Sequence, residues 1–508
     1  MPHHESLWLA TTDGPTYPAL DAPLDVDVAV VGAGIAGLST AFLLKRRGVR
    51  VAVLEAGRVC GATTGHTTAK VSAQHGLTYD ALRSQFGAEA ARAYAEANVA
   101  AIDLMEALVH EHDVGCSWER RPAYAYTEDD EQIEAVEREV EAAREAGLPA
   151  SFTTETDLPW AVRAAVRFDA QAQFHPREYC LALARLVDGD GSRVFEGTRA
   201  VDVAEGSPCT VTTERSELRA AFVVLATHLP FLDRGAFFAK SHPEREYVVA
   251  ASLAQPAPRG MYISVEQPTR SVRQHTVDGS ELLILAGESH KTGQDPDTEA
   301  RYAALADFAR DRFDVESIDY RWSTQDYMPV DQVPYIGRLR RGSERLYVAT
   351  AFKKWGMTHG TVAGMVISDQ ILGRENPWTA LFEPNRVTPG ASAKSFVKEN
   401  LDVAKRFVGD RIRPQGPSDA DGLEPGDGAV ISVGGERVAA SRDDDGRLHV
   451  VSARCTHLGC IVSWNPAERS WDCPCHGSRF SADGAVLEGP AVEPLEPRAA
   501  PADAEVPG

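Results

Sequence analysis

Residues 26–37 read Val-Asp-Val-Ala-Val-Val-Gly-Ala-Gly-Ile-Ala-Gly, and this stretch decides the fold of the first part of the chain. An apolar, β-rich run leads into Gly32, Gly34 and Gly37 and then into a helix with apolar periodicity. A second apolar strand follows the helix and ends at Glu55. Such a strand–turn–helix unit binds dinucleotides, because glycines allow the tight turn, the close approach of a pyrophosphate and the packing of helix on strand.

The same unit predicts where the ligand binds. The first helical residues, Ile35 and Ala36, lie at a helix N-terminus, where backbone N–H groups are free to bind phosphate oxygens. Glu55 follows Gly37 by 18 residues, a spacing that places its carboxylate to accept a hydrogen bond from a ribose hydroxyl. We therefore expect a dinucleotide cofactor at this turn.

The patterns beyond this unit divide the chain into three parts. Residues 1–385 alternate strand-like runs with helical patterns, as in an α/β domain, with a helical excursion at 79–147. Residues 386–424 contain a predicted helix at 395–408 and a breaker-rich linker. Residues 425–508 show short alternating strands and Asp-Gly turns, which predict a small all-β domain.

Composition limits the possible partners. The formal net charge is −22, which disfavours binding to nucleic acids or anionic membranes. The N-terminus, Met-Pro-His-His-Glu, lacks the basic and apolar regions of a secretory signal, and no apolar stretch predicts a membrane span. We expect a cytoplasmic protein without stable membrane insertion.

Four of the eight cysteines gather near the C-terminus. Residues 455–460 read Cys-Thr-His-Leu-Gly-Cys and residues 473–478 read Cys-Pro-Cys-His-Gly-Ser, with twelve residues between them. Each segment offers a thiolate and an imidazole on a short glycine-containing loop, which is the ligand set of a Rieske [2Fe–2S] cluster. A structural zinc site is the alternative, but it explains neither the additional cysteine pair nor the matched loops. The expected ligands are Cys455, His457, Cys473 and His476.

Residues 425–497 resemble the Rieske proteins of respiratory complexes, and residues 489–491, Gly-Pro-Ala, match the proline loop of that family. The resemblance implies a disulfide between Cys460 and Cys475, and a hydrogen bond from Ser478 to a cluster sulfur. Where the family has Tyr, this chain has Phe480, so one hydrogen bond to a ligand sulfur is missing and the potential should be lower. Exposed edges of the two ligand histidines would form the docking tip.

Residues 26–380 resemble the D-amino acid oxidase superfamily, which includes glycine and sarcosine oxidases, and this implies FAD as the dinucleotide. The match covers the small-residue loop at 61–66, the strands at 198–203 and 222–227, and the C-terminal flavin motif at 334–360. The resemblance implies FAD-binding segments at about 26–80, 150–230 and 325–380, with an interleaved α+β substrate domain between them. The flavin residues that it implies are Thr63, Thr64, Gly65, His66, Ala200, Gly337, Gly356, Met357 and Thr358.

The resemblance also suggests catalytic candidates. His66 follows a Thr-rich turn, as does the covalently flavinylated His of sarcosine and dimethylglycine dehydrogenases; a noncovalent His beside the cofactor is the alternative. Residues 287–291 resemble a segment of sarcosine oxidases with an active-site His, which makes His290 and the neighbouring Lys291 candidates. Lys353 adjoins the flavin motif, although a surface Lys is an equal possibility. Arg321 and Arg338 are candidates for binding a substrate carboxylate.

Together these features predict an FAD-dependent dehydrogenase. It would oxidise a small amine or amino-acid-like substrate and pass electrons through the Rieske cluster to a quinone, a ferredoxin or another redox protein. A Rieske oxygenase is disfavoured, because only 32 residues follow His476 and no 2-His-1-carboxylate triad is evident. Reversed electron flow, and a purely electron-transferring or redox-sensing module, remain alternatives.

Overall fold

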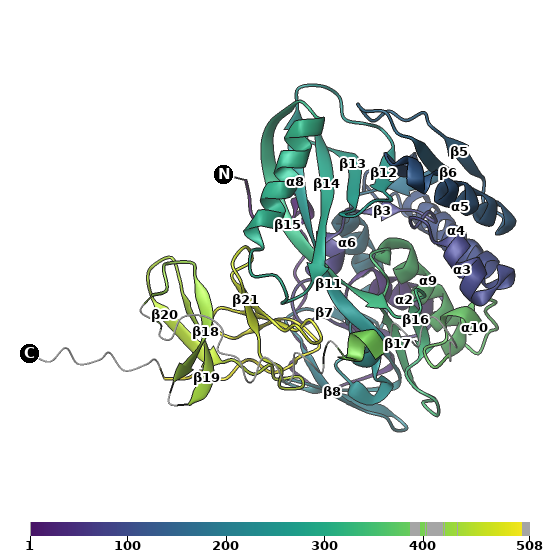
Figure 1. Cartoon of the computed structure of the whole chain (residues 1–508). Coiled ribbons are helices and arrows are strands. Elements are labelled where there is room, and N and C mark those ends of the chain that lie inside the picture. The colour runs from purple at the N-terminus through teal and green to yellow at the C-terminus, as the bar shows by residue number, and fades with distance from the viewer. Residues whose placement is uncertain are drawn as a thin grey trace, which may run out of the picture.

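The computed structural model describes residues 2–386, 397–401, 403, 420, 422–433 and 435–499. Two large sheets form the first part of the chain, and two small sheets form the C-terminal part, which packs against it (Figure 1). Residues 397–401 of the predicted helix at 395–408 are helical; the rest of that range, apart from residue 403, lies outside the described residues, as does most of the predicted linker. No helix in the described ranges is long and apolar enough to cross a membrane.

The first sheet has a five-stranded parallel core in the order β7-β2-β1-β10-β17. β16 adds antiparallel to β17, and the β8–β9 hairpin joins the core through β10. Its strands are β1 (Leu24–Val31), β2 (Val51–Leu54), β7 (Arg193–Phe195), β8 (Ala200–Ala204), β9 (Cys209–Thr213), β10 (Glu217–Leu225), β16 (Tyr335–Arg338) and β17 (Leu346–Thr350). The predicted Rossmann-type unit is therefore present.

Two helices of this unit pack unusually closely. α2 (Ile35–Lys45) starts at the glycine turn, and α9 (Gly356–Ile371) starts at the C-terminal flavin motif. A Cβ at Gly360 would lie 2.7 Å from Cγ2 of Ile35, and one at Gly364 would lie 2.8 Å from Cβ of Ser39. Only glycine therefore lets α9 approach α2 at this distance, which brings both helix N-termini to the same region.

The second sheet is nine-stranded and mostly antiparallel, in the order β15-β11-β14-β13-β12-β4-β6-β3, with β5 paired to β6. Its strands come from separate stretches of the chain, so the two domains are interleaved. They are β3 (Lys70–Val71), β4 (Glu119–Thr127), β5 (Ala150–Thr153), β6 (Ala164–Gln173), β11 (Ser241–Leu253), β12 (Met261–Ser264), β13 (Arg270–Val277), β14 (Ser280–Lys291) and β15 (Val315–Pro329).

The excursion at 79–147 is helical except for one strand. It contains α3 (Tyr79–Phe86), α4 (Ala88–Glu111) and α5 (Ile133–Glu145), but β4 runs between α4 and α5 and joins the second sheet. The remaining α-helices are α1 (Leu7–Ala10), α6 (Pro176–Val187), α7 (Phe237–Lys240), α8 (Glu299–Arg312) and α10 (Thr379–Phe382), and the short 3₁₀ turns are η1 (Thr63–His66), η2 (Asp130–Gln132) and η3 (Asp233–Gly235).

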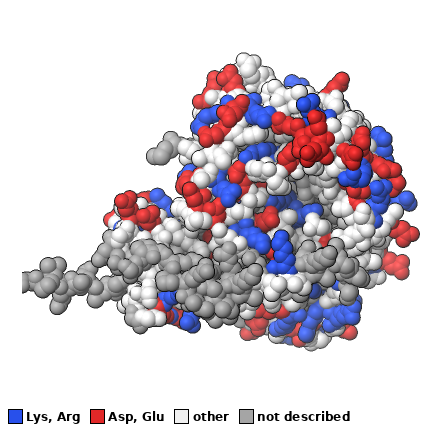
Figure 2. Space-filling model, viewed as in Figure 1, with Lys and Arg blue, Asp and Glu red and all other residues white. Residues whose placement is uncertain are grey.

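The C-terminal part is all-β, as predicted. A three-stranded sheet lies away from the flavoprotein part, and a four-stranded sheet lies nearer to it (Figure 1). Its strands are β18 (Gly428–Val433), β19 (Glu436–Arg442), β20 (Leu448–Ser452), β21 (Ser463–Asn465), β22 (Ser470–Asp472), β23 (Arg479–Ser481) and β24 (Val486–Glu488). On the face in Figure 2, acidic and basic side chains are interspersed, so the net charge does not appear there as one acidic patch.

Candidate active site

A cavity of about 830 Å³ lies where the two large sheets meet the C-terminal domain. The glycine turn, the loop after β2, the start of α9 and residues 486–492 of the C-terminal domain all contribute to its wall. Of the expected cofactor residues, the ones that line it are Gly32, Gly34, Ile35, Ala36, Glu55, Thr63, Thr64, His66, Ala200, Gly356 and Met357.

The glycine turn has no room for side chains. Gly32 has a φ of +105°, and a Cβ there would lie 2.4 Å from the carbonyl oxygen of Ala226. A Cβ at Gly37 would lie 1.9 Å from the carbonyl oxygen of Gly32. At Gly34, a Cβ would approach Oγ1 of Thr64 to 2.9 Å. The bare backbone at this turn therefore fits the close approach of a pyrophosphate.

Glu55 also organises the turn. Its two carboxylate oxygens accept hydrogen bonds from the backbone N–H groups of Ala33 and Gly57, each at 2.8 Å. Burial raises the pKa of this carboxyl group. Each carboxylate oxygen has a second lone pair, so Glu55 can still accept from a ribose hydroxyl while it holds the loop.

The other expected flavin residues, Gly65, Gly337 and Thr358, lie in the loops and helix that form the wall, outside the cavity lining. A Cβ at Gly65 would lie 2.1 Å from the carbonyl oxygen of Cys60, and Gly337 has a φ of +139°. The hydroxyl of Thr358 lies 3.3 Å from the carbonyl oxygen of Ser72 and 3.3 Å from Nε2 of His75. These residues, like Gly37, set the shape of the loops and do not line the cavity.

His66 lines the cavity with one ring nitrogen already occupied. Its Nδ1–H donates to the carbonyl oxygen of Ala62 at 2.9 Å, so Nε2 carries the lone pair. Burial lowers the pKa of this ring, which favours the neutral form.

The three predicted catalytic residues lie outside the cavity lining. Nε2 of His290 lies 2.9 Å from the hydroxyl of Tyr247, and Nζ of Lys291 lies 2.6 Å from the carboxylate of Glu399. The strand is irregular here, because Glu288 has a φ of +56°. The neighbouring Ser289 accepts a hydrogen bond from Lys354, which lines the cavity. Lys353 is half-buried, and burial lowers its pKa to about 8.

Lys354 is the lysine that lines the cavity. Its Nζ donates to Oγ of Ser289 at 2.6 Å and lies 3.1 Å from the carboxylate of Glu244 and 3.7 Å from that of Glu246. Burial acts to lower the pKa of Lys354, but the two carboxylates outweigh it and raise the pKa. This lysine is therefore a fixed positive charge in the cavity wall.

The wall also holds polar residues that the sequence did not indicate, among them Arg245, His228 and Asp326. Arg245 is 1% exposed, and its Nε and Nη1 have no hydrogen-bond partner among the described residues. His228 follows the end of β10, a position at the carboxyl edge of a parallel sheet that could have indicated a binding residue. Its Nε2 lies 3.0 Å from Oδ1 of Asp326.

The two arginines predicted to bind a substrate carboxylate lie elsewhere. Arg321 pairs with Glu299, and neither Arg321 nor Arg338 lines the cavity.

The four expected cluster ligands lie on two adjacent loops. Cys455 and Cys473 are buried, unpaired thiols, and the rings of His457 and His476 have centroids 5.1 Å apart. Nδ1 of each ring is buried without a hydrogen-bond partner in the described part of the chain. Two thiols and two imidazole nitrogens with free lone pairs are a donor set that fits a Rieske [2Fe–2S] cluster.

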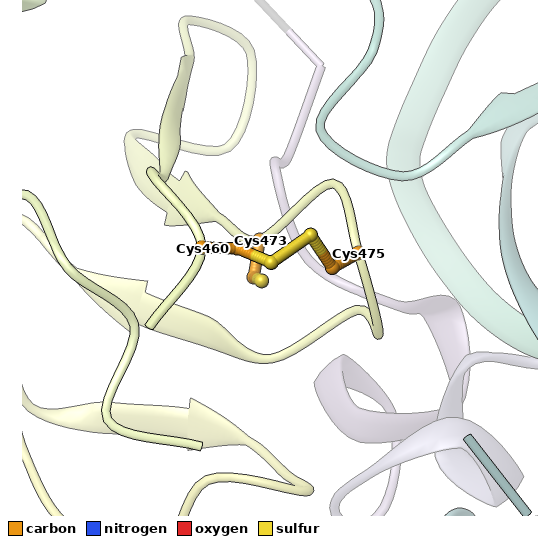
Figure 3. Close-up of side chains that lie close together, drawn as sticks. All are labelled: Cys460, Cys473 and Cys475. Carbon is orange, nitrogen blue, oxygen red and sulfur yellow. A yellow bond between two sulfur atoms is a disulfide. The ribbon is translucent and has the colours of Figure 1, made fainter. Parts of the chain in front are cut away.

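The remaining cysteine pair forms a disulfide between Cys460 and Cys475, which joins the two loops (Figure 3). Sγ of Cys473 lies within 4.8 Å of both disulfide sulfurs. Because disulfide sulfurs are not thiolates, these three sulfurs do not form a separate metal site. Oγ of Ser478 accepts a hydrogen bond from the backbone N–H of Ala491. The pKa of Cys455 is lowered mainly by a hydrogen bond with Cys473, and Ser478 adds a smaller contribution.

The expectation of an exposed histidine tip is wrong. The side chain of His457 is 5% exposed and its Nε2 lies 2.9 Å from Oδ1 of Asp233, while His476 is 4% exposed. The ring of Phe238 lies 5.2 Å from that of His476 and 6.1 Å from that of His457. η3 and α7 of the flavoprotein part therefore cover the tip, a long-range contact that neither loop sequence indicates.

Comparison with known proteins assigns the class that this fold and site define. The family model for FAD dependent oxidoreductases matches residues 27–370, and the model for the Rieske [2Fe-2S] domain matches residues 418–499. The chain belongs to the FAD dependent oxidoreductase family, carries a C-terminal Rieske domain, and binds FAD and a [2Fe–2S] cluster.

Individual relatives agree with this assignment. The chain is 39% identical to the putative Rieske 2Fe-2S iron-sulfur protein YhfW of Bacillus subtilis, over 97% of each chain. It is 22% identical to gamma-glutamylputrescine oxidoreductase of Escherichia coli, over 81% of this chain and 100% of the other. Glycine oxidase from Geobacillus kaustophilus has the same fold over 72% of this chain and 99% of its own, with 20% identity and a TM-score of 0.61.

Proposed function

We propose that this chain is a dehydrogenase that oxidises a small amine or amino-acid-like substrate and delivers the electrons, through its Rieske cluster, to an external one-electron acceptor. The carrying observation is the shared cavity: residues 486–492 of the Rieske domain and the glycine turn line the same space. When bound, FAD removes a hydride equivalent from a C–H bond and the cluster carries single electrons. A flavin enclosed by the domain that carries the cluster favours internal transfer.

The geometry described above suggests which residues bind the cluster and FAD. We assign the cluster to Cys455, His457, Cys473 and His476, with Cys460 and Cys475 as the clamp. We assign FAD to the cavity-lining residues given above, with Gly37, Gly65, Gly337 and Thr358 shaping the wall. The free Nε2 lone pair of His66 is compatible with a covalent flavin bond, which release or retention of the flavin after acid precipitation decides.

Substrate binding is proposed to use the polar wall. Lys354 supplies a fixed positive charge in the wall that can attract a substrate carboxylate. The buried guanidinium of Arg245 is already paired with the carboxylates of Glu468 at 3.4 Å and Glu488 at 4.0 Å. Because Lys354 lines the cavity, we propose it in preference to Lys353, His290 and Lys291 as the residue that assists the reaction. The names of gamma-glutamylputrescine oxidoreductase and glycine oxidase support an amine or amino acid as the substrate class.

The acceptor is proposed to be a quinone, a ferredoxin or another redox protein, in the cytoplasm. The test is an anaerobic titration of the full-length holoprotein with candidate amines and amino acids, following flavin absorbance and the EPR signal of the reduced cluster. Flavin bleaching that precedes cluster reduction supports the proposal. As a control, Cys473→Ser should lose the cluster signal while substrate still bleaches the flavin. Bleaching by NAD(P)H and by no amine would instead establish reversed flow.

A further inference from the structure

We propose that electrons pass between the flavin cavity and the cluster through the end of β15. Tyr327 and Gln325 are the residues that hold the loop of residues 473–478, here called the second ligand loop, against this strand end. The inference needs only the two bound cofactors; it does not depend on the substrate or on the direction of flow in the proposed function. It rests on two chains of hydrogen bonds that cross the domain interface and that meet where Nε2 of Gln325 donates to the hydroxyl of Tyr327 at 3.4 Å.

The first chain passes through Tyr327. Its hydroxyl donates a hydrogen bond of 2.9 Å to the carbonyl oxygen of His476, a proposed cluster ligand. The preceding residue, Asp326, lines the flavin cavity, so one peptide unit separates the cavity wall from the tyrosine. Tyr327 is 1% exposed, and its backbone N–H also donates to Oδ1 of Asp326 at 2.7 Å.

The second chain passes through Gln325. Its side-chain Nε2 donates to the carbonyl oxygen of Gly477 at 2.9 Å, and its Oε1 accepts from Oγ1 of Thr292 at 2.8 Å. On the other side, its backbone carbonyl oxygen accepts a hydrogen bond of 3.3 Å from Oγ1 of Thr63, which lines the cavity. Gln325 therefore touches the cavity wall and the ligand loop at once.

His228 links the two chains at the cavity. Its Nδ1 lies 3.3 Å from Oγ1 of Thr63, and its Nε2 lies 3.0 Å from Oδ1 of Asp326. The ring also packs edge-on against Tyr327, with centroids 4.7 Å apart. A continuous set of bonds, hydrogen bonds and ring contacts thus runs from the wall of the cavity to the backbone of His476.

The interface between the second ligand loop and the flavoprotein part is tightly packed at Gly477. A Cβ at Gly477 would lie 2.7 Å from Cβ of Pro243, 2.8 Å from Nε2 of Gln325 and 3.0 Å from the hydroxyl of Tyr327, so only glycine lets the loop approach this closely. A buried polar group that loses its hydrogen-bond partner is destabilising, and these two side chains bond the Rieske loop across the interface. The docked arrangement is therefore the one that their chemistry favours.

Each transfer along this route moves one electron and no atoms. One electron leaves reduced FAD, and one of the two ferric ions of the oxidised cluster becomes ferrous. A second electron can follow only after an external one-electron acceptor has reoxidised the cluster. Because electronic coupling decays more slowly through bonds and hydrogen bonds than across gaps, loss of a bridging hydroxyl should slow the transfer.

The test uses the full-length holoprotein without substrate. The flavin is reduced photochemically by deazaflavin under anaerobic conditions, and its one-electron exchange with the cluster is followed by transient absorbance. Tyr327→Phe removes one hydroxyl and should slow the exchange several-fold, and it should shift the EPR g values and midpoint potential of the cluster. Tyr79→Phe is the matched control, because Tyr79 is equally buried and donates to the carbonyl oxygen of Ala73 at 2.7 Å, away from the cavity lining.

Gln325→Met breaks the second chain and replaces Tyr327→Phe if that variant does not retain iron. It too should slow the exchange, and the double variant should be slower than either single one. Wild-type exchange rates, EPR spectra and potentials in both single variants, at full cluster content, would overturn the proposal. Because no substrate is present, that result would leave the proposed dehydrogenase activity untouched, just as a failure of all amines to bleach the flavin would leave this route untouched.

Discussion

Replacement of Gly293 by alanine should loosen the Rieske domain although the residue belongs to the flavoprotein part. Gly293 follows β14 and has a φ of +68°. A Cβ there would lie 2.8 Å from the carbonyl oxygen of Asp472 and 2.9 Å from the backbone nitrogen of Pro474, the residues on either side of Cys473. The substituted methyl group would therefore press directly on the second ligand loop.

The free energy of unfolding that Gly293→Ala removes has two contributions. An alanine in the left-handed region costs about 1–2 kcal/mol. Ordinary contact begins at 3.4 Å, so the Cβ of residue 293 is too close by 3.4 − 2.8 = 0.6 Å. The contacted atoms belong to the backbone and cannot rotate away, and such overpacking costs about 1–3 kcal/mol more. Gly279, with a φ of +82° and no described heavy atom within 4 Å of its Cβ, is the matched control that carries only the first cost.

The assay is urea unfolding followed by the visible circular dichroism of the cluster and, separately, by flavin fluorescence. Gly293→Ala should lower the stability reported by the cluster by about 1–3 kcal/mol more than Gly279→Ala does. Equal effects of the two substitutions on the cluster signal would refute the close packing of the two domains at this loop.

Three further predictions follow from buried groups. The double substitution Cys460→Ser with Cys475→Ser opens a loop of sequence separation 15, so cluster stability should fall by about 3 kcal/mol, and thermal bleaching at the wild-type temperature would contradict this. Burial, and then the charge of Arg273, lower the pKa of Lys70 in the folded chain to about 7. Between pH 7 and the ordinary pKa of 10.5, the unfolded chain therefore binds more protons than the folded chain. The stability of the wild type consequently increases as pH rises through this range. Lys70→Met should therefore be more stable than the wild type at pH 7, with an advantage that shrinks toward pH 10 in urea titrations; a pH-independent difference would argue against it. Arg479→Met leaves the buried carboxylate of Asp472 without its ion-pair partner, and leaves Glu468 and Glu488 to share Arg245. It should cost about 3–5 kcal/mol, measured as an earlier thermal loss of cluster absorbance, whereas an unchanged transition would show that this charge is dispensable.

The sequence predicted features whose causes are local. The glycine turn at 32–37 and the Cys-His loops at 455–460 and 473–478 each place their groups within a few residues, so spacing alone indicates the chemistry. The sequence could not predict that Lys354, and not Lys353, lines the cavity. The two residues have consecutive positive φ values of 53° and 67°, and this local backbone conformation decides which side chain points to the cavity. The burial of His457 could not be predicted either, because its cover comes from η3, over two hundred residues earlier.

The shared cavity wall also sets an order of assembly during synthesis. The last helix of the nucleotide-binding unit, α9, ends at Ile371, so it leaves the ribosome 486 − 371 = 115 residues before the first wall residue of the Rieske domain. At translation rates of about 5–20 residues per second, that interval is about 6 to 23 s. During this time the nucleotide pocket lacks one side, so FAD can enter a nascent flavoprotein domain that is already foldable. Docking of the C-terminal domain then completes the enclosure, which makes cofactor loading an early step and cluster docking a late one.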